Sequence, residues 1–407
     1  MSFMVERLGR KGDGVARAED GRAVLAERVL PGEVIDGKPV AGRIAQPRIL
    51  HPAPERVAPR CPHYAGCGGC NLMHASDEFV AGWKIDQVGA ALAAQGIKAR
   101  PAGIATSPER SRRRAVFAGR RTKGGALVGF HARGSDVIVD ITDCRVIRPA
   151  LQDLLPALRR IVVAGASRAG KLAITATETP AGADVAVRGG KPISAELMQK
   201  LTGIAAETGI ARLSWEGEVI TLRPPELMLG GAAVTPPPGA FLQATAEGEA
   251  ALRAAVLRIV AGARHVVDLF AGCGTFTLPI AAHAEVHAVE GLAAPLAALD
   301  AACRRTPRLR RISTETRDLA ARPLLVDELA RYDAIVIDPP RSGAEAQAAQ
   351  IAASDVPRVA WVSCDPVSFA RDCRILLAGG YRLAALYAVD QFRFSPHIET
   401  VAAFTRN

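Results

Sequence analysis

The last third of the chain alternates short apolar runs with helical patterns, and this alternation constrains the fold more than any other feature. Four apolar segments are each followed by a loop and a helical pattern: 265–270, 286–290, 334–338 and 359–363. Continuous apolar strands separated by helices are typical of a parallel sheet covered on both faces. We therefore expect residues 236–407 to form an α/β domain, with its ligands at the carboxyl ends of the strands.

A glycine-rich segment, Asp268–Thr275, ends the first of these strands and opens a helix. Gly272 and Gly274 allow a tight turn in which the backbone can approach a ligand closely. Glu290 closes the next strand, where its carboxylate can accept hydrogen bonds from ribose hydroxyls. A dinucleotide site would have a third glycine near the pyrophosphate, but Thr277 stands at that position. The segment therefore favours a nucleoside without phosphates, such as S-adenosylmethionine.

Two more motifs follow later strands at the same edge. Asp338-Pro-Pro-Arg341 follows one, and Ser363-Cys-Asp-Pro366 follows the next. A cysteine on such a loop can be a nucleophile if its thiolate is favoured, although buried cysteines more often pack as small apolar residues. The position of Cys364 beside two other strand-end motifs favours chemistry. Glu399 is a lone acid beside an apolar terminal strand and by itself indicates a surface carboxylate.

A cluster of cysteines lies far from these motifs. Cys61, Cys67 and Cys70 fall within ten residues, and Cys144 is the obvious distant fourth. In a cytosolic chain such clustering indicates metal binding or catalysis rather than structural disulfides. Four thiolates could hold structural zinc or an iron–sulfur cluster, and the spacing does not choose between them.

The remaining sequence predicts two further domains. Residues 1–52 contain short β-type runs punctuated by Gly and Pro, which favours a small β-barrel of the kind that holds nucleic acid. Residues 53–235 follow a proline-rich joint and combine helical spacing at 77–96 with alternating strand patterns, which indicates an α+β domain. We expect domains at 1–52, 53–235 and 236–407.

The net charge of +10 indicates a polyanionic partner. Between residues 98 and 133 there are ten Lys or Arg residues and one acid, with Arg112-Arg113-Arg114 the densest group. We interpret this segment as phosphate-binding rather than as a solvated face. No apolar run reaches the length of a membrane span, and the first residues lack a signal-peptide pattern, so we expect a cytoplasmic protein without a membrane partner.

Together these motifs closely resemble the bacterial RNA uracil-C5 methyltransferase family over almost the whole chain. Besides the cysteine cluster and the strand-end motifs, the resemblance rests on Phe241-Leu-Gln243 and His397-Ile-Glu-Thr-Val401. Residues 1–52 resemble the TRAM domain, an OB-like, RNA-binding β-barrel of the branch that acts on ribosomal RNA. The resemblance implies a Rossmann-like class I methyltransferase domain at the C-terminus. It also implies a [4Fe-4S] cluster on Cys61, Cys67, Cys70 and Cys144, in preference to zinc.

The resemblance also implies roles for individual residues. The S-adenosyl-L-methionine site would be lined by Gln243, Phe270, Thr275, Glu290, Asp318 and Asp338. Cys364 would be the nucleophile and Glu399 the base. Many relatives have Asn where Thr275 and Asp365 stand, and the N-terminal domain is short. The implied substrate is 23S rRNA, with tRNA as the alternative, and we expect a monomer.

The chemistry of uracil predicts the order of events. C5 is too weak a nucleophile to accept a methyl group directly, whereas addition of the Cys364 thiolate to C6 produces an enolate whose charge reaches C5. A base must then remove the C5 proton so that the cysteine can leave, and Glu399 is the candidate. A stacked uridine cannot reach such a pocket and must be flipped out.

Three other interpretations are less complete. An iron–sulfur electron carrier or redox enzyme would leave Cys364 and Glu399 without a role. An inert RNA-binding module does not explain why the cofactor loop and the Cys/Glu pair are both intact. Cytosine-C5 enzymes also use a cysteine, and DNA is a conceivable substrate, but the motif set resembles the RNA-uracil enzymes.

Overall fold

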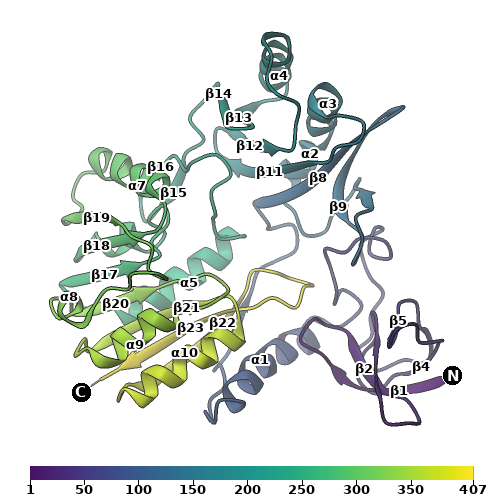
Figure 1. Cartoon of the computed structure of the whole chain (residues 1–407), viewed down its shortest axis with the longest axis horizontal. Helices are drawn as coiled ribbons and strands as arrows, with labels where there is room; N and C mark the ends of the chain where they lie inside the picture. Colours follow the sequence, from purple (N-terminus) through teal and green to yellow (C-terminus); the bar gives the residue numbers. More distant parts are fainter. Residues whose placement is uncertain (407) are drawn as a thin grey trace.

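The computed structural model of the protein describes residues 1–406. Figure 1 shows three sheets that follow one another along the chain: a small N-terminal one, a central one, and a large one that contains the C-terminal strand. A two-stranded hairpin, β15 (Leu227–Leu229) and β16 (Ala232–Val234), separates the last two sheets in the sequence. Among the helices of residues 1–406, none combines the length and the apolar character needed to cross a lipid bilayer.

The N-terminal sheet has six short strands in the order β5-β3-β2-β1-β4-β6. Their bounds are β1 Ser2–Leu8, β2 Gly14–Arg17, β3 Ala23–Ala26, β4 Val34–Asp36, β5 Arg43–Ile44 and β6 Arg48–His51. Inward-facing side chains such as Phe3, Val5 and Ile35 form a small apolar core. This part of the chain is all-β, as its short β-type runs predict, and its assignment as a TRAM domain stays a prediction.

The central sheet has seven strands in the order β10-β9-β8-β11-β12-β13-β14, and only β12 and β13 pair in parallel. The strands are β8 Arg114–Thr122, β9 Gly125–His131, β10 Ile138–Asp140, β11 Leu172–Thr179, β12 Gly182–Arg188, β13 Ile210–Trp215 and β14 Glu218–Thr221. Its helices are α2 Pro149–Asp153, α3 Leu155–Gly165 and α4 Ala195–Glu207. Phe117 and Trp215 are buried in the core that α3 and α4 form with the sheet. The predicted α+β arrangement is present here.

The C-terminal sheet has eight strands in the order β19-β18-β17-β20-β21-β23-β22-β7. Its strands are β7 Ile104–Thr106, β17 His265–Leu269, β18 Glu285–Glu290, β19 Ile312–Thr316, β20 Ala334–Ile337, β21 Arg358–Ser363, β22 Arg382–Asp390 and β23 Glu399–Thr405. The strands from β19 to β21 are parallel, and β23 runs antiparallel to both of its neighbours. The predicted parallel sheet is therefore confirmed, with the antiparallel strand β23 inserted between β21 and β22.

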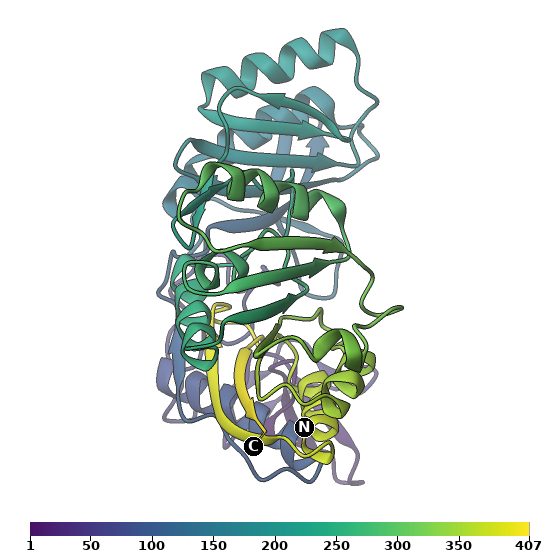
Figure 2. The ribbon, with the colours of Figure 1, turned by 90° about the vertical axis from the view of Figure 1, so that its left-hand side faces the viewer.

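Helices cover both faces of this sheet, as Figure 2 shows. They are α1 Asp77–Ala93, α5 Ala246–Ile259, α6 Thr277–Ile280, α7 Ala293–Arg305, α8 Val326–Leu329, α9 Glu345–Ala353 and α10 Pro366–Ala378. One apolar core joins α1, α9 and α10 to the sheet, and a second joins α5 and α6 to its other face. The carboxyl ends of the parallel strands meet at one edge of the sheet.

One segment expected in the central domain packs on the C-terminal sheet instead. Strand β7 pairs in parallel with β22, and α1 packs against α10, where Val88 and Leu92 are fully buried. The helical spacing of α1 predicts its apolar face but does not predict which core covers that face. Residues 77–106 thus tie the expected central domain to the C-terminal one, while the boundaries at 52 and 235 stay predictions.

The arginine triplet 112–114 does not form the phosphate-binding surface that its charge density predicts. Arg113 is buried, forms an ion pair with Glu249 of α5, and donates to the main-chain oxygen of Gln243. Arg114 donates to the main-chain oxygens of Gly239 and Ala240. Arg112 lies over the ring of Phe392, 5.3 Å from its centre. The burial of Arg113 contradicts a phosphate-binding role for that residue, because these guanidinium groups join the central sheet to the C-terminal part of the chain. Phosphate binding by the rest of the segment 98–133 stays a prediction.

We expect Arg113→Ala to lower the free energy of unfolding by about 3 kcal/mol, because the Glu249 carboxylate would stay buried without its main partner. This loss is small for a broken buried ion pair because Arg253 remains 3.5 Å from Glu249 and partly balances its charge. Urea unfolding measures the change. Arg120→Ala is the control, since this exposed arginine of β8 should change stability by no more than about 0.5 kcal/mol. A stable Arg113→Ala protein with weakened RNA binding would restore the phosphate-binding interpretation.

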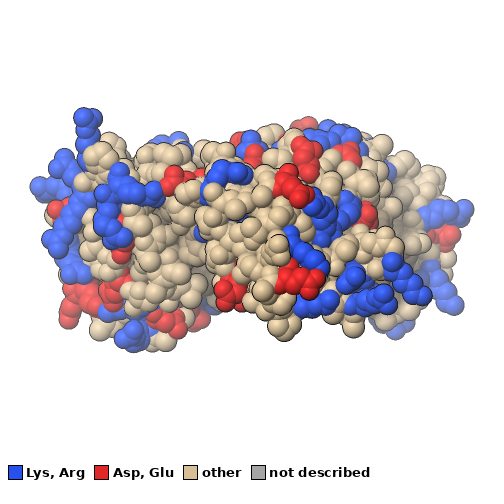
Figure 3. Space-filling model, turned by 90° about the horizontal axis from the view of Figure 1, so that it is seen from above, with Lys and Arg blue, Asp and Glu red and all other residues tan. Residues whose placement is uncertain are grey.

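Exposed arginines gather elsewhere, in the last turn of α7 and the segment from there to β19. Five lie within eight residues: Arg304, Arg305, Arg308, Arg310 and Arg311. Figure 3 shows Lys and Arg concentrated at the end of the molecule where Figure 1 places these two elements. This group precedes β19, so it lies at the amino-terminal edge of the parallel strands and not at the edge where ligands bind.

Candidate active site at the carboxyl edge of the large sheet

The glycine-rich loop after β17 makes the tight turn that its sequence predicts. Phe270, Gly272 and Gly274 all have positive φ angles, of 62°, 54° and 92°. A Cβ on Gly274 would lie 2.6 Å from the side chain of Leu299, so no larger residue fits there without a shift. Thr275 follows in the same loop and is partly exposed. The loop backbone is therefore open to a ligand at the carboxyl end of β17.

Thr277 stands where a dinucleotide site would have its third glycine, and it has a structural partner. Its hydroxyl donates to the carboxylate of Asp268 at 2.5 Å, which ties the start of α6 to the end of β17. Asp268 is fully buried, and burial raises its pKa to about 7. Thr277 thus anchors the loop at the point where a dinucleotide would need space.

The two acids predicted to hold the nucleoside lie at the ends of adjacent strands. Glu290, at the end of β18, accepts from the main-chain N–H of Gly272 at 3.1 Å and of Leu292 at 3.0 Å. Each of its oxygens keeps accepting capacity for a hydroxyl. Asp318 follows β19, is exposed, and accepts from the main-chain N–H of Ala320 at 3.0 Å. Backbone donors fix both carboxylates, and Glu290 contacts the glycine-rich loop through Gly272.

A chain of side-chain hydrogen bonds joins the end of β20 to the start of β23. Gln243 donates to Asp338 at 3.3 Å, and Gln391 donates both to Gln243, at 2.5 Å, and to Glu399, at 3.2 Å. The other end of the Gln391 amide accepts from the main-chain N–H of Ala244 at 2.8 Å, which fixes its orientation. Gln391 is buried, so its donors have no competing water. Asp338 and Glu399 are therefore held in one network.

The pairing of β21 with β23 places Cys364 close enough to Glu399 for the Glu399 charge to affect the pKa of the thiol. The ladder ends where Ser363 pairs with Thr400, and Cys364 and Glu399 are the next residues beyond that pair. The hydroxyl of Thr400 donates to the main-chain oxygen of Ser363 at 3.3 Å, which holds the two strand ends together. The residues are 35 positions apart in the sequence, and only the antiparallel ladder brings them together.

The surroundings of Cys364 and Glu399 raise the pKa of both side chains. Burial raises the pKa of Glu399 to about 8, and the nearby charge of Asp338 adds to this effect. Burial raises the pKa of the Cys364 thiol to about 12, with Glu399 and Asp338 contributing in the same direction and Arg341 opposing them. Burial likewise raises the pKa of Asp338 to about 7. Near neutral pH, Glu399 is thus mostly protonated, and a carboxylate formed there is a stronger base than an exposed one.

Asp365, where many relatives have Asn, caps the helix that follows the cysteine. One carboxylate oxygen accepts from the main-chain N–H groups of Val367, at 2.8 Å, and Ser368, at 3.2 Å, at the start of α10. The other lies 3.4 Å from the guanidinium of Arg10, which comes from the N-terminal sheet. An Asn could make the same cap, so the difference affects charge more than local structure.

The loop that leads into Glu399 is held by the segment that contains the first cysteines. The carbonyl oxygen of Phe394 accepts from the main-chain N–H of Asn71 at 2.7 Å and of Leu72 at 2.9 Å. At the start of this loop, Asp390 forms a buried ion pair with Lys84 of α1 at 2.6 Å. Two segments from the first hundred residues therefore position the loop of residues 390–399.

The four cysteines predicted as metal ligands line one cavity of about 80 Å³, together with Tyr64, Met73 and Phe130 among others. Burial raises the pKa of Cys67, Cys70 and Cys144. Main-chain N–H groups donate to two of the sulfur atoms, from Gly69 to Cys67 and from Val146 to Cys144, both at 3.4 Å. Such donors stabilise thiolates, so the cavity suits a cationic group that would balance the sulfur charge.

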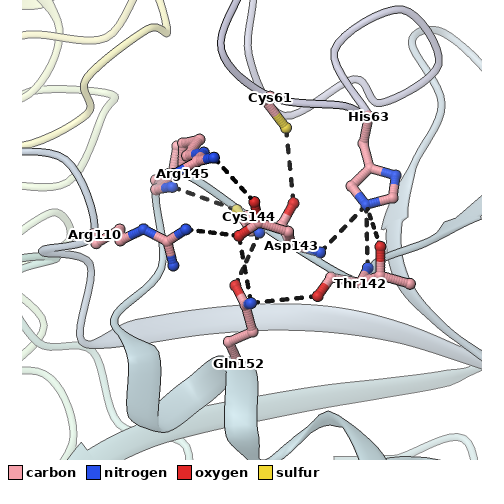
Figure 4. A network of polar contacts seen from close by, with 9 residues as sticks. Cys61, His63, Arg110, Thr142, Asp143, Cys144, Arg145 and Gln152 are labelled. Atoms are coloured by element: carbon pink, nitrogen blue, oxygen red, sulfur yellow. Dashed lines mark hydrogen bonds and ion pairs between the residues drawn. The ribbon is translucent and has the colours of Figure 1, made fainter.

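Polar contacts fix the distant fourth cysteine, as Figure 4 shows. The side-chain oxygen of Gln152 accepts from the Cys144 main-chain N–H at 2.9 Å, and His63 Nε2 accepts from that of Thr142 at 3.1 Å. The thiol of Cys61 lies 3.9 Å from the carbonyl oxygen of Asp143. Within residues 1–406, however, no three His, Cys, Asp or Glu side chains are arranged to hold a metal ion. The cysteines converge as predicted, but a metal centre stays a prediction.

Known proteins match this chain over its whole length. Residues 237–407 match the profile of the family described as tRNA (Uracil-5-)-methyltransferase. An uncharacterized RNA methyltransferase of Brucella suis biovar 1 is 43% identical over 99% of this chain and 97% of its own. The 23S rRNA (uracil(1939)-C(5))-methyltransferase RlmD of Chromohalobacter salexigens is 32% identical over 99% of this chain and 89% of its own. The chain belongs to the RNA uracil-C5 methyltransferase family.

The fold of this RNA uracil-C5 methyltransferase also has a solved counterpart. The tRNA (uracil-54, C5)-methyltransferase of Pyrococcus abyssi, in complex with S-adenosyl-L-homocysteine, has a TM-score of 0.75 and covers 100% of both chains. At 19% sequence identity this likeness concerns the fold. It confirms the Rossmann-like methyltransferase domain predicted for the C-terminal part. Like its family, the enzyme depends on S-adenosylmethionine.

Three residues of this methyltransferase's site lack any signal in the sequence. Gln391 donates to Glu399, and Lys84 pairs with Asp390 at the start of the loop that leads to Glu399. Arg10 reaches Asp365. Each lies in a stretch whose pattern indicates ordinary surface or helix positions. Arg10 and Asp365 are 355 residues apart in the sequence, so neither spacing nor composition predicts their contact.

Proposed function

We propose that this methyltransferase transfers a methyl group to C5 of a specific uridine in 23S rRNA, with Cys364 as covalent nucleophile and Glu399 as base. The meeting of Cys364 and Glu399 at the edge where the glycine-rich loop lies is the observation that carries the proposal. A relative named as a 23S rRNA enzyme matches 99% of the chain, which favours ribosomal RNA. The description of the matching family profile favours tRNA as the second candidate.

The first step is addition of the Cys364 thiolate to C6 of the flipped uracil. The C5–C6 double bond opens, its electron pair moves to C5 and the O4 carbonyl, and C5 becomes nucleophilic. The thiol is protonated in the free protein because burial and two nearby carboxylates raise its pKa. The thiol proton is released to solvent as the thiolate forms, and Glu399 must likewise lose its own proton before it can act as the base in the last step.

The second step passes the methyl group to C5 and leaves a proton on that carbon. S-adenosylmethionine supplies the methyl group as an electrophile bound to a sulfonium. The residues proposed to hold it are those at the carboxyl edge: Gln243, Phe270, Thr275, Glu290, Asp318 and Asp338. Of these, Glu290 is already oriented by two backbone donors.

The last step removes the C5 proton and releases the enzyme. Glu399 accepts the proton, the C5–C6 double bond re-forms, and the thiolate leaves C6 with its bonding electrons. A base with a pKa near 8 suits this task better than an exposed carboxylate. Gln391 donates to one Glu399 oxygen and so leaves the other for the proton.

We further propose that Cys61, Cys67, Cys70 and Cys144 bind a [4Fe-4S] cluster. The four thiolates would hold the cluster. Their shared cavity and the N–H donors to sulfur support the proposal. Such a cluster would stabilise the loop of residues 61–73, which contacts the loop leading to Glu399.

Protein purified without oxygen is expected to be brown and to contain about four irons per chain. Iron analysis and the visible absorption spectrum measure this. Cys67→Ser should lose the colour, whereas Cys303→Ser, which changes a cysteine of α7 outside the cavity, should keep it. Zinc in place of iron would contradict the cluster and leave the methyltransferase proposal intact.

The substrate is tested by counting 5-methyluridine in RNA from cells with and without the gene. We expect one modified uridine of 23S rRNA to lose its methyl group completely, while tRNA keeps its full content. Purified enzyme should then restore the modification on the deproteinised 23S rRNA. Loss from tRNA instead would establish the second candidate, and no change in either RNA would refute both.

A further inference from the structure

We infer that Arg10, on the turn between β1 and β2, is a phosphate-binding residue at the rim of the catalytic site. In the free enzyme Asp365 occupies the place of the phosphate. This inference deepens the proposed function, because it takes the uridine to lie at Cys364, next to Asp365 in the chain. Its partner is a backbone phosphate of the single-stranded RNA that enters the site.

The turn reaches the site from a distant part of the chain. Arg10 lies 3.4 Å from Asp365, and its side chain is 62% exposed. Lys11 beside it is exposed as well. Of the described residues that approach Cys364, Arg341 is also an exposed cation. Arg10 and Arg341 therefore present positive charge to anything that enters between the N-terminal sheet and the loop of Cys364.

The turn is held rigidly from behind. Within it, Gly9 donates to the Asp13 carbonyl at 2.7 Å and Gly12 donates to that of Gly9 at 2.8 Å. The buried Asp13 side chain pairs with Arg43, at 3.0 Å, and with Arg133 of the central part. Asn71 donates to the Lys11 carbonyl at 3.3 Å.

The same segment supports the catalytic loop, because Asn71 and Leu72 also donate to the Phe394 carbonyl. The segment of Asn71 and Leu72 thus contacts both the turn that contains Arg10 and the loop that leads to Glu399. The position of Arg10 relative to Cys364 is therefore built into the fold, and only the side chain beyond Cβ is free to move.

The contact with Asp365 is of a kind that a phosphate can replace. One Asp365 oxygen serves the start of α10, and only the other faces Arg10. Solvent screens an exposed ion pair of this length, so little stability is lost when it breaks. A guanidinium binds phosphate through two parallel hydrogen bonds, which is a stronger contact than the single one to Asp365.

The test measures binding of single-stranded decauridylate, in which every internal uridine lies between two backbone phosphates. Arg10→Ala should bind it about three- to tenfold more weakly at low salt. Its slope of log affinity against log salt should be shallower by about 0.7, the value for one lost contact to a single strand. Arg17→Ala is the matched control, because Arg17 lies in the same sheet, is equally exposed and pairs with Glu6. It should change neither value.

A second variant separates phosphate binding from a supporting role toward Asp365. Asp365→Asn keeps the helix cap and removes the ion pair. If Arg10 binds phosphate, this variant should bind decauridylate at least as tightly as the wild type. If Arg10 only orients Asp365, both variants should lose affinity alike, and that result would overturn the inference. So would an Arg10→Ala protein that behaves like Arg17→Ala. These binding results do not depend on whether Cys364 is the nucleophile, which is tested separately.

Discussion

Glu399→Gln is expected to trap the enzyme as a covalent complex with methylated RNA. If Glu399 acts only after methyl transfer, the variant can still add Cys364 to C6 and still methylate C5. It then lacks a base for the C5 proton, so elimination cannot proceed. Gln has nearly the shape of Glu, and Gln391 can still donate to its side-chain oxygen, so the fold should be kept.

The complex is measured as a band of reduced mobility that survives denaturation and forms only with S-adenosylmethionine. Turnover should fall to less than one product per enzyme. Glu247→Gln, at an exposed position of α5, is the matched control and should turn over normally. Normal turnover of Glu399→Gln would remove Glu399 from the mechanism. Binding of RNA and cofactor without any adduct would mean that the carboxylate acts earlier.

Cys364→Ala is expected to abolish methyl transfer while it keeps binding. Without the thiolate, C5 has no route to sufficient nucleophilicity, so we expect a loss of about 10⁴-fold or more, as when the nucleophile of a covalent enzyme is removed. The change removes one partly buried atom on a loop and leaves the strand pairing of Ser363 with Thr400 intact. Affinities for S-adenosylmethionine and RNA should therefore stay within about twofold of the wild type.

Single-turnover assays with labelled methyl groups measure this loss. Cys303→Ala, which removes a thiol from α7, should keep full activity. The double variant Cys364→Ala/Glu399→Gln should form no covalent complex, because the trapped adduct requires the thiolate. Residual activity of Cys364→Ala near the wild-type rate would end the covalent mechanism.

Local patterns in the sequence determined much of the catalytic domain. The alternation of apolar strands with helices predicts the parallel sheet, because strand burial on both faces leaves a continuous apolar run. The strand-end positions of Glu290, Asp338 and Cys364 follow from the same pattern, since the carboxyl ends of parallel strands share one edge. The glycines of the loop after β17 predict its positive φ angles. Each of these features depends on residues that are close in the sequence.

The pattern of charges predicted less of the structure, because the partner of a charged side chain in the fold decides whether that side chain is buried. The arginines 112–114 resemble a phosphate-binding segment in the sequence, yet Arg113 is buried against Glu249, 136 residues away. A dense group of exposed arginines lies at 304–311. Nothing local to either segment distinguishes a buried guanidinium from an exposed one.

Tertiary structure alone decided which residues share the site. The ladder between β21 and β23 brings Glu399 to Cys364, the packing of α1 against α10 brings Lys84 to Asp390, and the turn after β1 brings Arg10 to Asp365. Such contacts depend on how whole strands and helices pack. That packing is determined by apolar side chains at other positions of the same strands and helices. The sequence names the reactive groups, while the packing of distant elements sets their neighbours, their burial and hence their pKa values.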